Sequence, residues 1–188
     1  AQRRGRPLRF HTSWGLFSPR ELDEGSRLLL DHLEVRANDR AFDLGCGYGA
    51  LGIPVAAAFP EATAVLVDRD LLAVEFSRRN AAAAGLANAS VLPSLGYRDL
   101  PEEPATYDWI LANVPARAGE RVLGHFVEGG ARRLRAGGEM RIVIIAPLAD
   151  SAERAAAACG LAARSVARGA GPAVFAVRGG LRAPAGSP

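Results

Sequence analysis

The segment Phe42–Gly49 constrains the fold more than any other part of the sequence. It reads Phe-Asp-Leu-Gly-Cys-Gly-Tyr-Gly, so a short apolar run ends in Asp43 and glycines follow at positions 45, 47 and 49. Glycine adopts backbone conformations that a side chain forbids, and it lets the backbone approach a ligand closely. The segment therefore predicts a parallel strand that turns into a helix around a bound ligand.

Strands and helices are predicted to alternate along the chain. Apolar runs predict strands at 40–44, 62–68, 90–93, 107–112 and 140–146, followed by two strands at Val166 and Val174–Val177. Helices are predicted at 21–35, 50–58, 71–84, 119–135 and 150–159, with Gly85 and Gly137-Gly138 ending two of them. This order predicts an α/β, Rossmann-like fold. We expect a seven-stranded, mostly parallel sheet with an antiparallel last strand and helices on both faces.

The length of 188 residues suits one domain. We expect an N-terminal entry segment and helix over 1–35, a ligand-binding core over 36–178 and a tail over 179–188. The two cysteines, Cys46 and Cys159, form no disulfide framework. No apolar run is long enough to span a membrane, and no signal region is visible. The sequence thus predicts a cytoplasmic protein with no membrane partner.

Four polar residues end predicted strands or follow them directly: Asp43, Asp68, Ser94 and Asn113. Ligands of open parallel sheets bind at the carboxyl ends of the strands. We therefore expect these four side chains to converge on one edge of the sheet. The three histidines lie at no metal-ligand spacing, so no metal site is predicted.

Asp43 indicates which ligand the glycine loop binds. A turn that holds a pyrophosphate has little use for a carboxylate, because its ligand is an anion at a helix N-terminus. A carboxylate is better suited to a ligand that carries an ammonium and a sulfonium group. This predicts S-adenosylmethionine as the cofactor, and so methyl transfer. The segment 47–52 also fits the dinucleotide pattern G-x-G-x-x-G, but that signal is weak alone and nothing downstream suggests a nicotinamide site.

Two further elements fit an adenosyl cofactor and an amine acceptor. Asp68 can accept both ribose hydroxyls, or it can cap the following helix, for which Asp70 is better placed. The amide oxygen of Asn113 and the carbonyl of Val114 can accept hydrogen bonds from an exocyclic amine, and Pro115 stiffens the turn. The alternative for Asn113–Pro115 is an ordinary turn at a strand end.

The chain resembles the small-domain class I methyltransferases, typified by the guanine-N2 methyltransferases of small-subunit ribosomal RNA. Four segments carry the resemblance, which extends from about Phe10 to Val177. They are Gly15–Ser18 with Leu22–Ser26 (G-V-F-S and D-x-G-[ST]), Asp43–Gly49 (D-[LV]-G-C-G-x-G), Asn113–Ala116 (N-P-P-[FYI]) and Gly138–Val143 (G-G-E-[LM]-R-[IV]-V).

The resemblance implies roles for individual residues. The entry segment would lie over the cofactor, which would be held by Phe17, Asp43, Gly45, Gly47, Gly49, Asp68, Ser94, Leu95 and Asn113. Leu95 replaces an acidic residue near the adenine amine, for which Ser94 would partly substitute. Asn113, Val114 and Pro115 would form the catalytic motif. Val114 replaces the first proline of that motif, and Ala116 replaces a bulky residue that would stack on a base.

Three functions are consistent with these observations. The first is an N-methyltransferase that acts on a guanine exocyclic amine of ribosomal RNA. The second is an N-methyltransferase of small molecules, suggested by the changes at Val114 and Ala116. The third is a degenerate domain that binds the cofactor or RNA without turnover. All 23 basic residues are arginine and the net charge is +3, which is compatible with RNA but does not require it. No oligomeric state is predicted.

Overall fold

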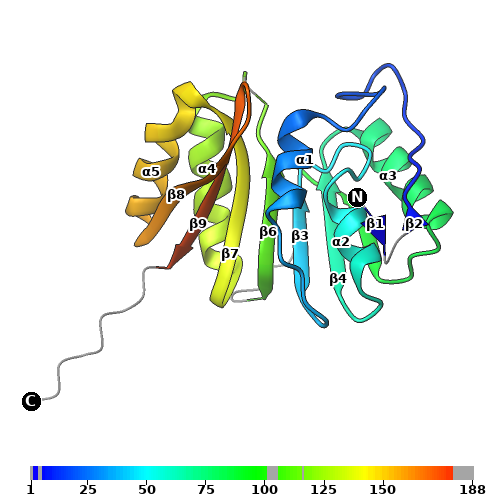
Figure 1. Cartoon of the computed structure of the whole chain (residues 1–188). Helices are drawn as coiled ribbons and strands as arrows, with labels where there is room; N and C mark the ends of the chain where they lie inside the picture. The colour runs from blue at the N-terminus through cyan, green and yellow to red at the C-terminus, as the bar shows by residue number, and fades with distance from the viewer. Residues whose placement is uncertain (1, 4–5, 101–105, 116, 180–188) are drawn as a thin grey trace, which may run out of the picture.

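The computed structural model describes residues 2–3, 6–100, 106–115 and 117–179, and its centre is a seven-stranded sheet (Figure 1). The strand order is β5-β4-β3-β6-β7-β9-β8. The strands are β3 (Arg40–Leu44), β4 (Thr63–Asp68), β5 (Ala89–Pro93), β6 (Tyr107–Asn113), β7 (Leu134–Ile145), β8 (Leu161–Arg168) and β9 (Pro172–Gly179). Neighbours from β5 to β7 run parallel, whereas β9 is antiparallel to both β7 and β8. The predicted Rossmann-like sheet with its antiparallel last strand is confirmed.

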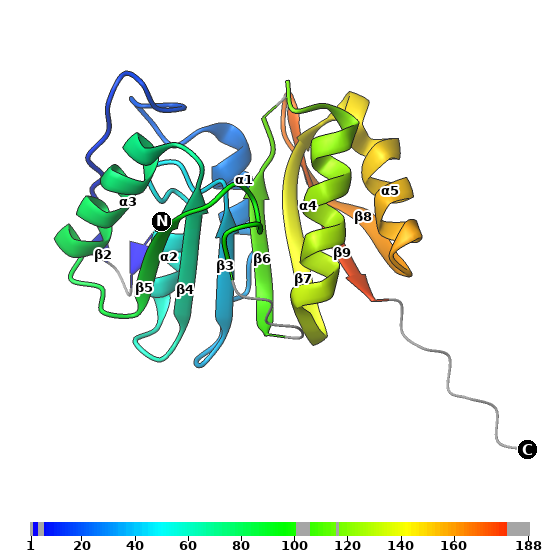
Figure 2. The ribbon, with the colours of Figure 1, turned by 180° about the vertical axis from the view of Figure 1, so that it is seen from behind.

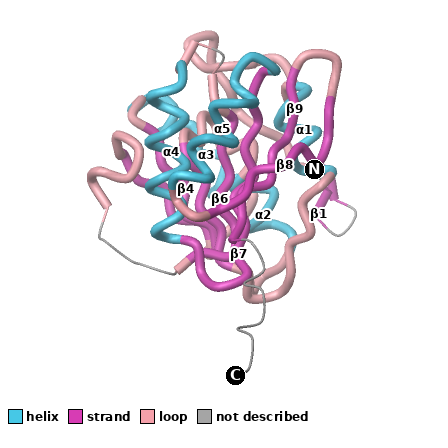
Figure 3. The backbone as a smooth tube through the Cα atoms, turned by 90° about the vertical axis from the view of Figure 1, so that its left-hand side faces the viewer, coloured by secondary structure: helices cyan, strands magenta, loops and turns pink. Residues whose placement is uncertain are grey.

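Helices cover both faces of the sheet, as Figures 1 and 2 show from opposite sides and Figure 3 shows edge-on. One face carries α1 (Glu24–Asp31), α2 (Gly52–Ala58) and α3 (Leu71–Ala83). The other carries α4 (Gly119–Arg133) and α5 (Ala149–Ala158), which a 3-10 turn at Ala146–Leu148 precedes. A two-stranded ladder of β1 (Gln2–Arg3) and β2 (Arg6–Pro7) lies near α2.

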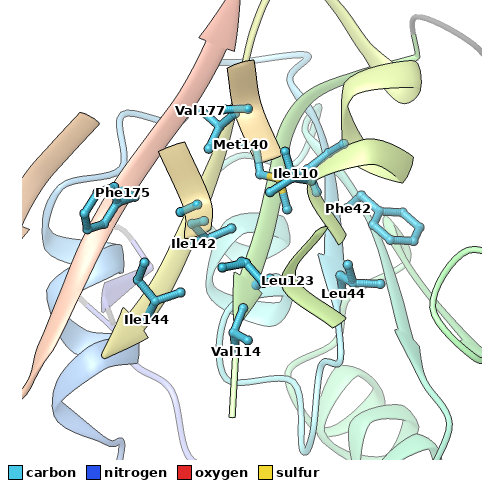
Figure 4. Close-up of a cluster of buried hydrophobic side chains, with 14 of the residues drawn as sticks. Phe42, Leu44, Ile110, Val114, Leu123, Met140, Ile142, Ile144, Phe175 and Val177 are labelled. Carbon is cyan, nitrogen blue, oxygen red and sulfur yellow. The ribbon is translucent and has the colours of Figure 1, made fainter. Parts of the chain in front are cut away.

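Each face of the sheet has its own hydrophobic core, because side chains alternate across a strand. Figure 4 shows the core beneath α4 and α5, where Leu123 packs among Ile110, Met140, Ile142 and other side chains of the sheet. The opposite core joins Leu29, Ile53 and Val74 of the three helices on that face to apolar side chains of the sheet. Burial on both faces explains why β4 and β6 contain unbroken apolar runs, at 64–67 and 109–112, rather than alternating patterns.

The structure corrects several predicted boundaries. The helix predicted at 21–35 is only Glu24–Asp31, because Asp23 is its N-cap and accepts a hydrogen bond from the Ser26 N–H. The helix predicted at 119–135 ends at Arg133, and Gly137-Gly138 lies inside β7 rather than between helix and strand. The strand at Val166 extends over Leu161–Arg168. The predicted loop 101–104 and nearly all of the predicted tail lie outside the described residues.

No helix among the described residues is long and apolar enough to cross a membrane.

Candidate functional site

The carboxyl ends of β4, β3 and β6 meet at one edge of the sheet and bring the predicted site residues together. Leu44 of β3 pairs with Val67 of β4 on one side and with Ala112 of β6 on the other. Asp68 and Asn113 follow these two partners directly. The chain leaves β3 toward β4 and later returns to its other side at β6, so this edge is the topological switch point at which ligands of such sheets bind.

The loop after β3 requires glycine at three positions, but the structural requirement differs between them. Gly45, Gly47 and Gly49 all have positive φ, at 73°, 56° and 92°. A Cβ on Gly45 or Gly47 would meet nothing within 4 Å, so open space lies beside both. A Cβ on Gly49 would lie 2.4 Å from Cδ1 of Ile53, so Gly49 lets α2 pack against the loop. The open cradle is therefore at Gly45 and Gly47.

Asp43 is an ionisable group in the core, with 1% of its surface exposed. Its Oδ2 accepts a hydrogen bond from the Gly52 N–H at 2.7 Å, but Oδ1 is buried without a hydrogen-bond partner. Burial raises the pKa of Asp43 to about 7; the Gly52 N–H opposes this rise, and the charge of Asp68 adds to it. A buried acceptor without a donor is costly, and a cationic donor at this edge would satisfy it.

Asp68 links the glycine loop to the start of α3. Its Oδ2 accepts from the Gly47 N–H and its Oδ1 from the Asp70 N–H, both at 2.9 Å. Asp70 is the N-cap of α3 and accepts from the Leu72 N–H, as the sequence predicts. A carboxylate offers about four lone pairs, so Asp68 keeps capacity for two hydroxyl donors.

The loop after β5 begins beside Asp68, where the Ser94 N–H donates to the Asp68 carbonyl at 2.9 Å. The Ser94 side chain is buried, and its hydroxyl donates to the Gly96 carbonyl and accepts from the Asp99 N–H. The side chain of Leu95 is exposed, and its N–H donates to Oδ2 of Asp99 at 3.0 Å. The polar group expected from Ser94 is therefore engaged inside its own loop.

The entry segment lies against the glycine loop. Leu16 is buried and packs with Tyr48 and Ala73, whereas Phe17 is 70% exposed. Asn80 of α3 ties the two segments together: it exchanges two hydrogen bonds with the backbone of His11 and donates a third to the Tyr48 carbonyl. Sequence analysis missed Asn80, although a polar residue on the buried face of an alanine-rich helix is the signal that could have found it.

Asn113 is held by the N-terminus of α1. Its Nδ2 donates to Oδ1 of Asp23 at 2.9 Å and to the Ser26 hydroxyl at 3.0 Å. A carboxylate only accepts, which fixes the amide nitrogen on this side and turns Oδ1 the other way. No described residue donates a hydrogen bond to that oxygen. The sequence motif D-x-G-[ST] contains both partners, but its role in orienting Asn113 was not predicted.

Gly25 explains how α1 reaches Asn113. A Cβ at this position would lie 2.4 Å from Cγ1 of Val143, so only glycine lets the first turn of α1 contact β7 this closely. The close contact brings Asp23 and Ser26 to the end of β6, where Asn113 pairs with Val143 in register.

Val114 follows Asn113 and points away from the open edge. Its side chain is buried in the core beneath α4, as Figure 4 shows. Its N–H donates to the Val143 carbonyl at 3.0 Å, a hydrogen bond that proline could not form. The Pro115 carbonyl accepts from the Ala118 N–H, and Ala116 lies outside the described residues.

The same edge contains no candidate metal site within the described ranges, where no group of three or more His, Cys, Asp or Glu side chains could hold an ion. Cys46 lies in the glycine loop, but burial raises the pKa of its thiol, so it is not prepared to act as a nucleophile.

The residues at this edge fit S-adenosylmethionine. Oδ1 of Asp43, which has no hydrogen-bond partner, suits the cationic methionine end of the cofactor. The open space beside Gly45 and Gly47 leaves room for the part of the cofactor that would lie against the loop backbone. Asp68 suits the ribose hydroxyls. When bound, this cofactor supplies an electrophilic methyl group.

Comparison with known proteins gives the same result. The family model "Methyltransferase small domain" matches residues 7–157. The chain is 37% identical over 142 residues to the uncharacterised protein YbxB of Bacillus subtilis, covering 75% of this chain and 70% of that protein. It is 40% identical over 141 residues to ribosomal RNA small subunit methyltransferase C of Stutzerimonas stutzeri, covering 73% of this chain and 41% of that enzyme.

A solved structure is similar over nearly all of the chain. It is the 16S rRNA N2 G1207 methyltransferase of Thermus thermophilus, in complex with AdoMet and guanosine, with a TM-score of 0.79 and 30% identity. The match covers 94% of this chain and 48% of that one, so the chain spans about half the length of this enzyme. On the evidence of the family match, the chain belongs to the methyltransferase small domain family, and it is an S-adenosylmethionine-dependent methyltransferase.

Proposed function

We propose that the protein methylates the exocyclic N2 amine of a guanine in small-subunit ribosomal RNA. The observation that carries the proposal is the orientation of Asn113, whose amide nitrogen is held by Asp23 and Ser26. Its amide oxygen and the Val114 carbonyl, to which no described residue donates, are then the acceptors at the edge that binds the cofactor.

Two acceptors suit a primary amine, because such an amine has two N–H donors. Hydrogen bonds to Asn113 Oδ1 and to the Val114 carbonyl would fix both hydrogens and leave the nitrogen lone pair for attack. The bond from nitrogen to the methyl carbon would form as the bond from that carbon to the sulfonium sulfur breaks. The nitrogen would then lose a proton to solvent. In this scheme the chain contributes mainly orientation, a large part of catalysis for such transfers.

The cofactor residues follow from the same geometry. Asp43 would accept from the ammonium group, Gly45 and Gly47 would admit the ligand beside the loop, and Asp68 would accept from the ribose. Gly49 would act through the packing of α2. The Ser94-Leu95 loop would border the adenine through the apolar side chain of Leu95, and Phe17 would cover the site from the entry segment.

The comparisons support a ribosomal RNA acceptor. The Stutzerimonas and Thermus enzymes are named as methyltransferases of small-subunit and 16S rRNA, and the Thermus structure contains guanosine. Both proteins are about twice as long as the matched part. That this chain has the same acceptor is therefore our proposal. The position of the side chain of Val114 in the core weakens the small-molecule alternative, since this residue does not reshape the open edge. Membership of an enzyme family argues against a non-catalytic domain.

The test is transfer of labelled methyl groups to small-subunit ribosomal RNA that lacks N2-methylguanine, with the modified nucleoside identified by mass spectrometry. We expect N2-methylguanosine from the wild-type protein and a fall in kcat of at least about a hundredfold for Asn113→Ala. Asn38→Gly is the matched control, because Asn38 has a φ of 68° in a turn before β3, at the opposite end of that strand. Full activity of Asn113→Ala, or transfer only to metabolite amines, would refute the proposal.

A further inference from the structure

Trp14 is the most exposed large apolar side chain among the described residues, with 78% of its surface accessible. The loop that carries it is nevertheless well anchored. The Thr12 hydroxyl donates to the Pro19 carbonyl at 2.5 Å and closes the base of the loop, and the Leu16 N–H donates to the Ser13 carbonyl. Leu16 is buried in a small core with Tyr48. The fold therefore presents Trp14 to solvent on a fixed support.

Arg20 lies over Trp14. Its guanidinium carbon is 4.8 Å from the centroid of the indole ring, within range of a cation–π interaction. An open hollow of about 200 Å³ adjoins the pair and is lined by Thr12, Ser13, Trp14, Pro19 and Arg20. An aromatic plane beside a cation matches a nucleotide, which offers a base to stack and a phosphate to pair.

The loop lies beside the cofactor edge. A Cβ on Gly15 would lie 3.0 Å from Leu72 in the first turn of α3, and Leu16 packs on the glycine loop. Figure 1 shows the entry segment at the end of the sheet where β3 and β4 lead into their loops, on the α3 side, whereas Asn113 ends β6 on the other side of β3. A polynucleotide with its target base at Asn113 could thus continue toward Trp14.

The charge of the loop favours an anionic partner. Residues 12–20 contain Arg20 and no acidic residue, and Arg9 precedes them. Aromatic and arginine side chains side by side are typical of surfaces that bind single-stranded nucleic acid.

We propose that Trp14 and Arg20 form a binding site for a nucleotide that flanks the methylated one. Its base stacks on the accessible surface of Trp14, and its phosphate pairs with Arg20. This inference rests on the RNA acceptor proposed above and adds a second contact to it, separate from the cofactor and from Asn113.

The test uses the full chain and an RNA fragment that contains the methylated guanine in its single-stranded context. Trp14→Ala should weaken RNA binding by about tenfold or more, the expected loss of one stacked base, and leave the Kd for S-adenosylmethionine unchanged. Trp14→Phe should retain most of the affinity, because it keeps an aromatic plane. Arg20→Ala should weaken binding and reduce the slope of log K against log salt concentration by about 0.7, as for one phosphate contact.

Arg36→Ala is the charge-matched control, since the side chain of Arg36 is exposed in the turn before β3; its RNA affinity should equal that of the wild type. Wild-type affinity of Trp14→Ala on an RNA that the wild-type protein methylates would overturn this inference and leave the proposed function standing. An equal loss of RNA and cofactor binding would also overturn it, because the loop would then act as part of the cofactor site. If the wild-type protein binds no RNA, the RNA acceptor and this inference both fail.

Discussion

Asn80 and His11, 69 positions apart in the sequence, exchange two hydrogen bonds. The His11 N–H donates to Asn80 Oδ1 at 2.7 Å, and Asn80 Nδ2 donates to the His11 carbonyl at 2.9 Å. The same Nδ2 donates to the carbonyl of Tyr48 in the glycine loop. A second residue of α3, Ser77, donates to the Gly47 carbonyl at 2.9 Å. One buried face of α3 therefore fixes both the cofactor loop and the entry segment.

Replacing Asn80 by alanine should loosen both segments. The change leaves three backbone groups without their partner at a buried position, each costing about 1–3 kcal/mol before relaxation. We expect a loss of about 3 kcal/mol in the free energy of unfolding, measured by chemical denaturation, and weaker binding of S-adenosylmethionine. Asn80→Asp should be nearly as damaging, because a carboxylate cannot donate to the two carbonyls. A stable Asn80→Ala protein with normal cofactor affinity would show that packing alone holds the entry segment.

The glycine loop offers a pair of matched substitutions. Gly47→Ala places a Cβ in open space at a φ of 56°, so the fold should lose only about 1–2 kcal/mol while cofactor binding is lost. Gly49→Ala forces a Cβ against Ile53 at a φ of 92°, so the clash adds to the backbone strain and the free energy of unfolding should fall by about 2–5 kcal/mol. Denaturation and calorimetric titration of both variants separate the two roles. Equal effects on stability would mean that Gly47 is also a packing glycine.

Restoring the proline of the family motif should harm this chain. Val114→Pro removes the hydrogen bond to the Val143 carbonyl and takes a valine side chain out of the core. We expect the free energy of unfolding to fall by about 2–4 kcal/mol, with no gain in methyl transfer. Denaturant unfolding and the RNA assay test both parts. Unchanged stability together with higher activity would show that Val114 is a catalytic defect rather than a structural adaptation.

Periodicity and turn residues were sufficient to predict the sheet. The strand Arg40–Leu44 was predicted to the residue, and the N-cap role of Asp70 follows from its place one residue before the helix. Boundaries were less accurate where tertiary pairing overrides local signals. Gly137-Gly138 looks like a helix end, but pairing of β7 with β6 begins already at Leu134.

The sequence predicted where the residues of the candidate site lie, because they stand at strand ends, but it did not predict their contacts. The positions of Asp43, Asp68 and Asn113 follow from where their strands stop. What orients Asn113 does not, because Asp23 and Ser26 contact it across 90 and 87 residues of sequence. The bonds that hold the entry segment are equally distant, since Asn80 and His11 lie 69 residues apart. The sequence also does not predict which way a side chain points after a strand ends, as the buried side chains of Val114 and Ser94 show.

The raised pKa of Asp43 predicts pH-dependent cofactor binding. The ligand-free protein holds the Asp43 proton up to a pH of about 7, whereas a bound cation favours the carboxylate and lowers that pKa. Affinity for S-adenosylmethionine should therefore increase from pH 6 to about pH 7.5, below the pKa of the ligand's α-amino group, with release of up to one proton per cofactor near pH 6.5. Calorimetry in buffers of different ionisation enthalpy measures that release. An affinity independent of pH would place the cation away from Asp43.

The same group should make the ligand-free fold less stable as the pH rises. Between the unfolded pKa near 3.8 and the folded value of about 7, the folded protein binds more protons than the unfolded chain, so stability decreases with pH across that window. The melting temperature of the ligand-free protein should thus contain a component that falls from pH 5 to pH 7.5. Saturating cofactor should remove that component, because its bound cation keeps Asp43 ionised across this pH range.

Ser26 should affect turnover more than binding, because it touches Asn113 and not the open edge. Ser26→Ala removes one of the two acceptors for Asn113 Nδ2 and leaves Asp23 as the other. The amide would then sample other orientations, and its oxygen would meet the acceptor amine less often. We expect kcat for RNA methylation to fall about tenfold, with less than a twofold change in the Kd for S-adenosylmethionine. Ser26→Thr keeps the hydroxyl and should restore most of kcat. If Ser26→Ala lowers the melting temperature and cofactor affinity as much as it lowers kcat, Ser26 stabilises α1 and does not position Asn113.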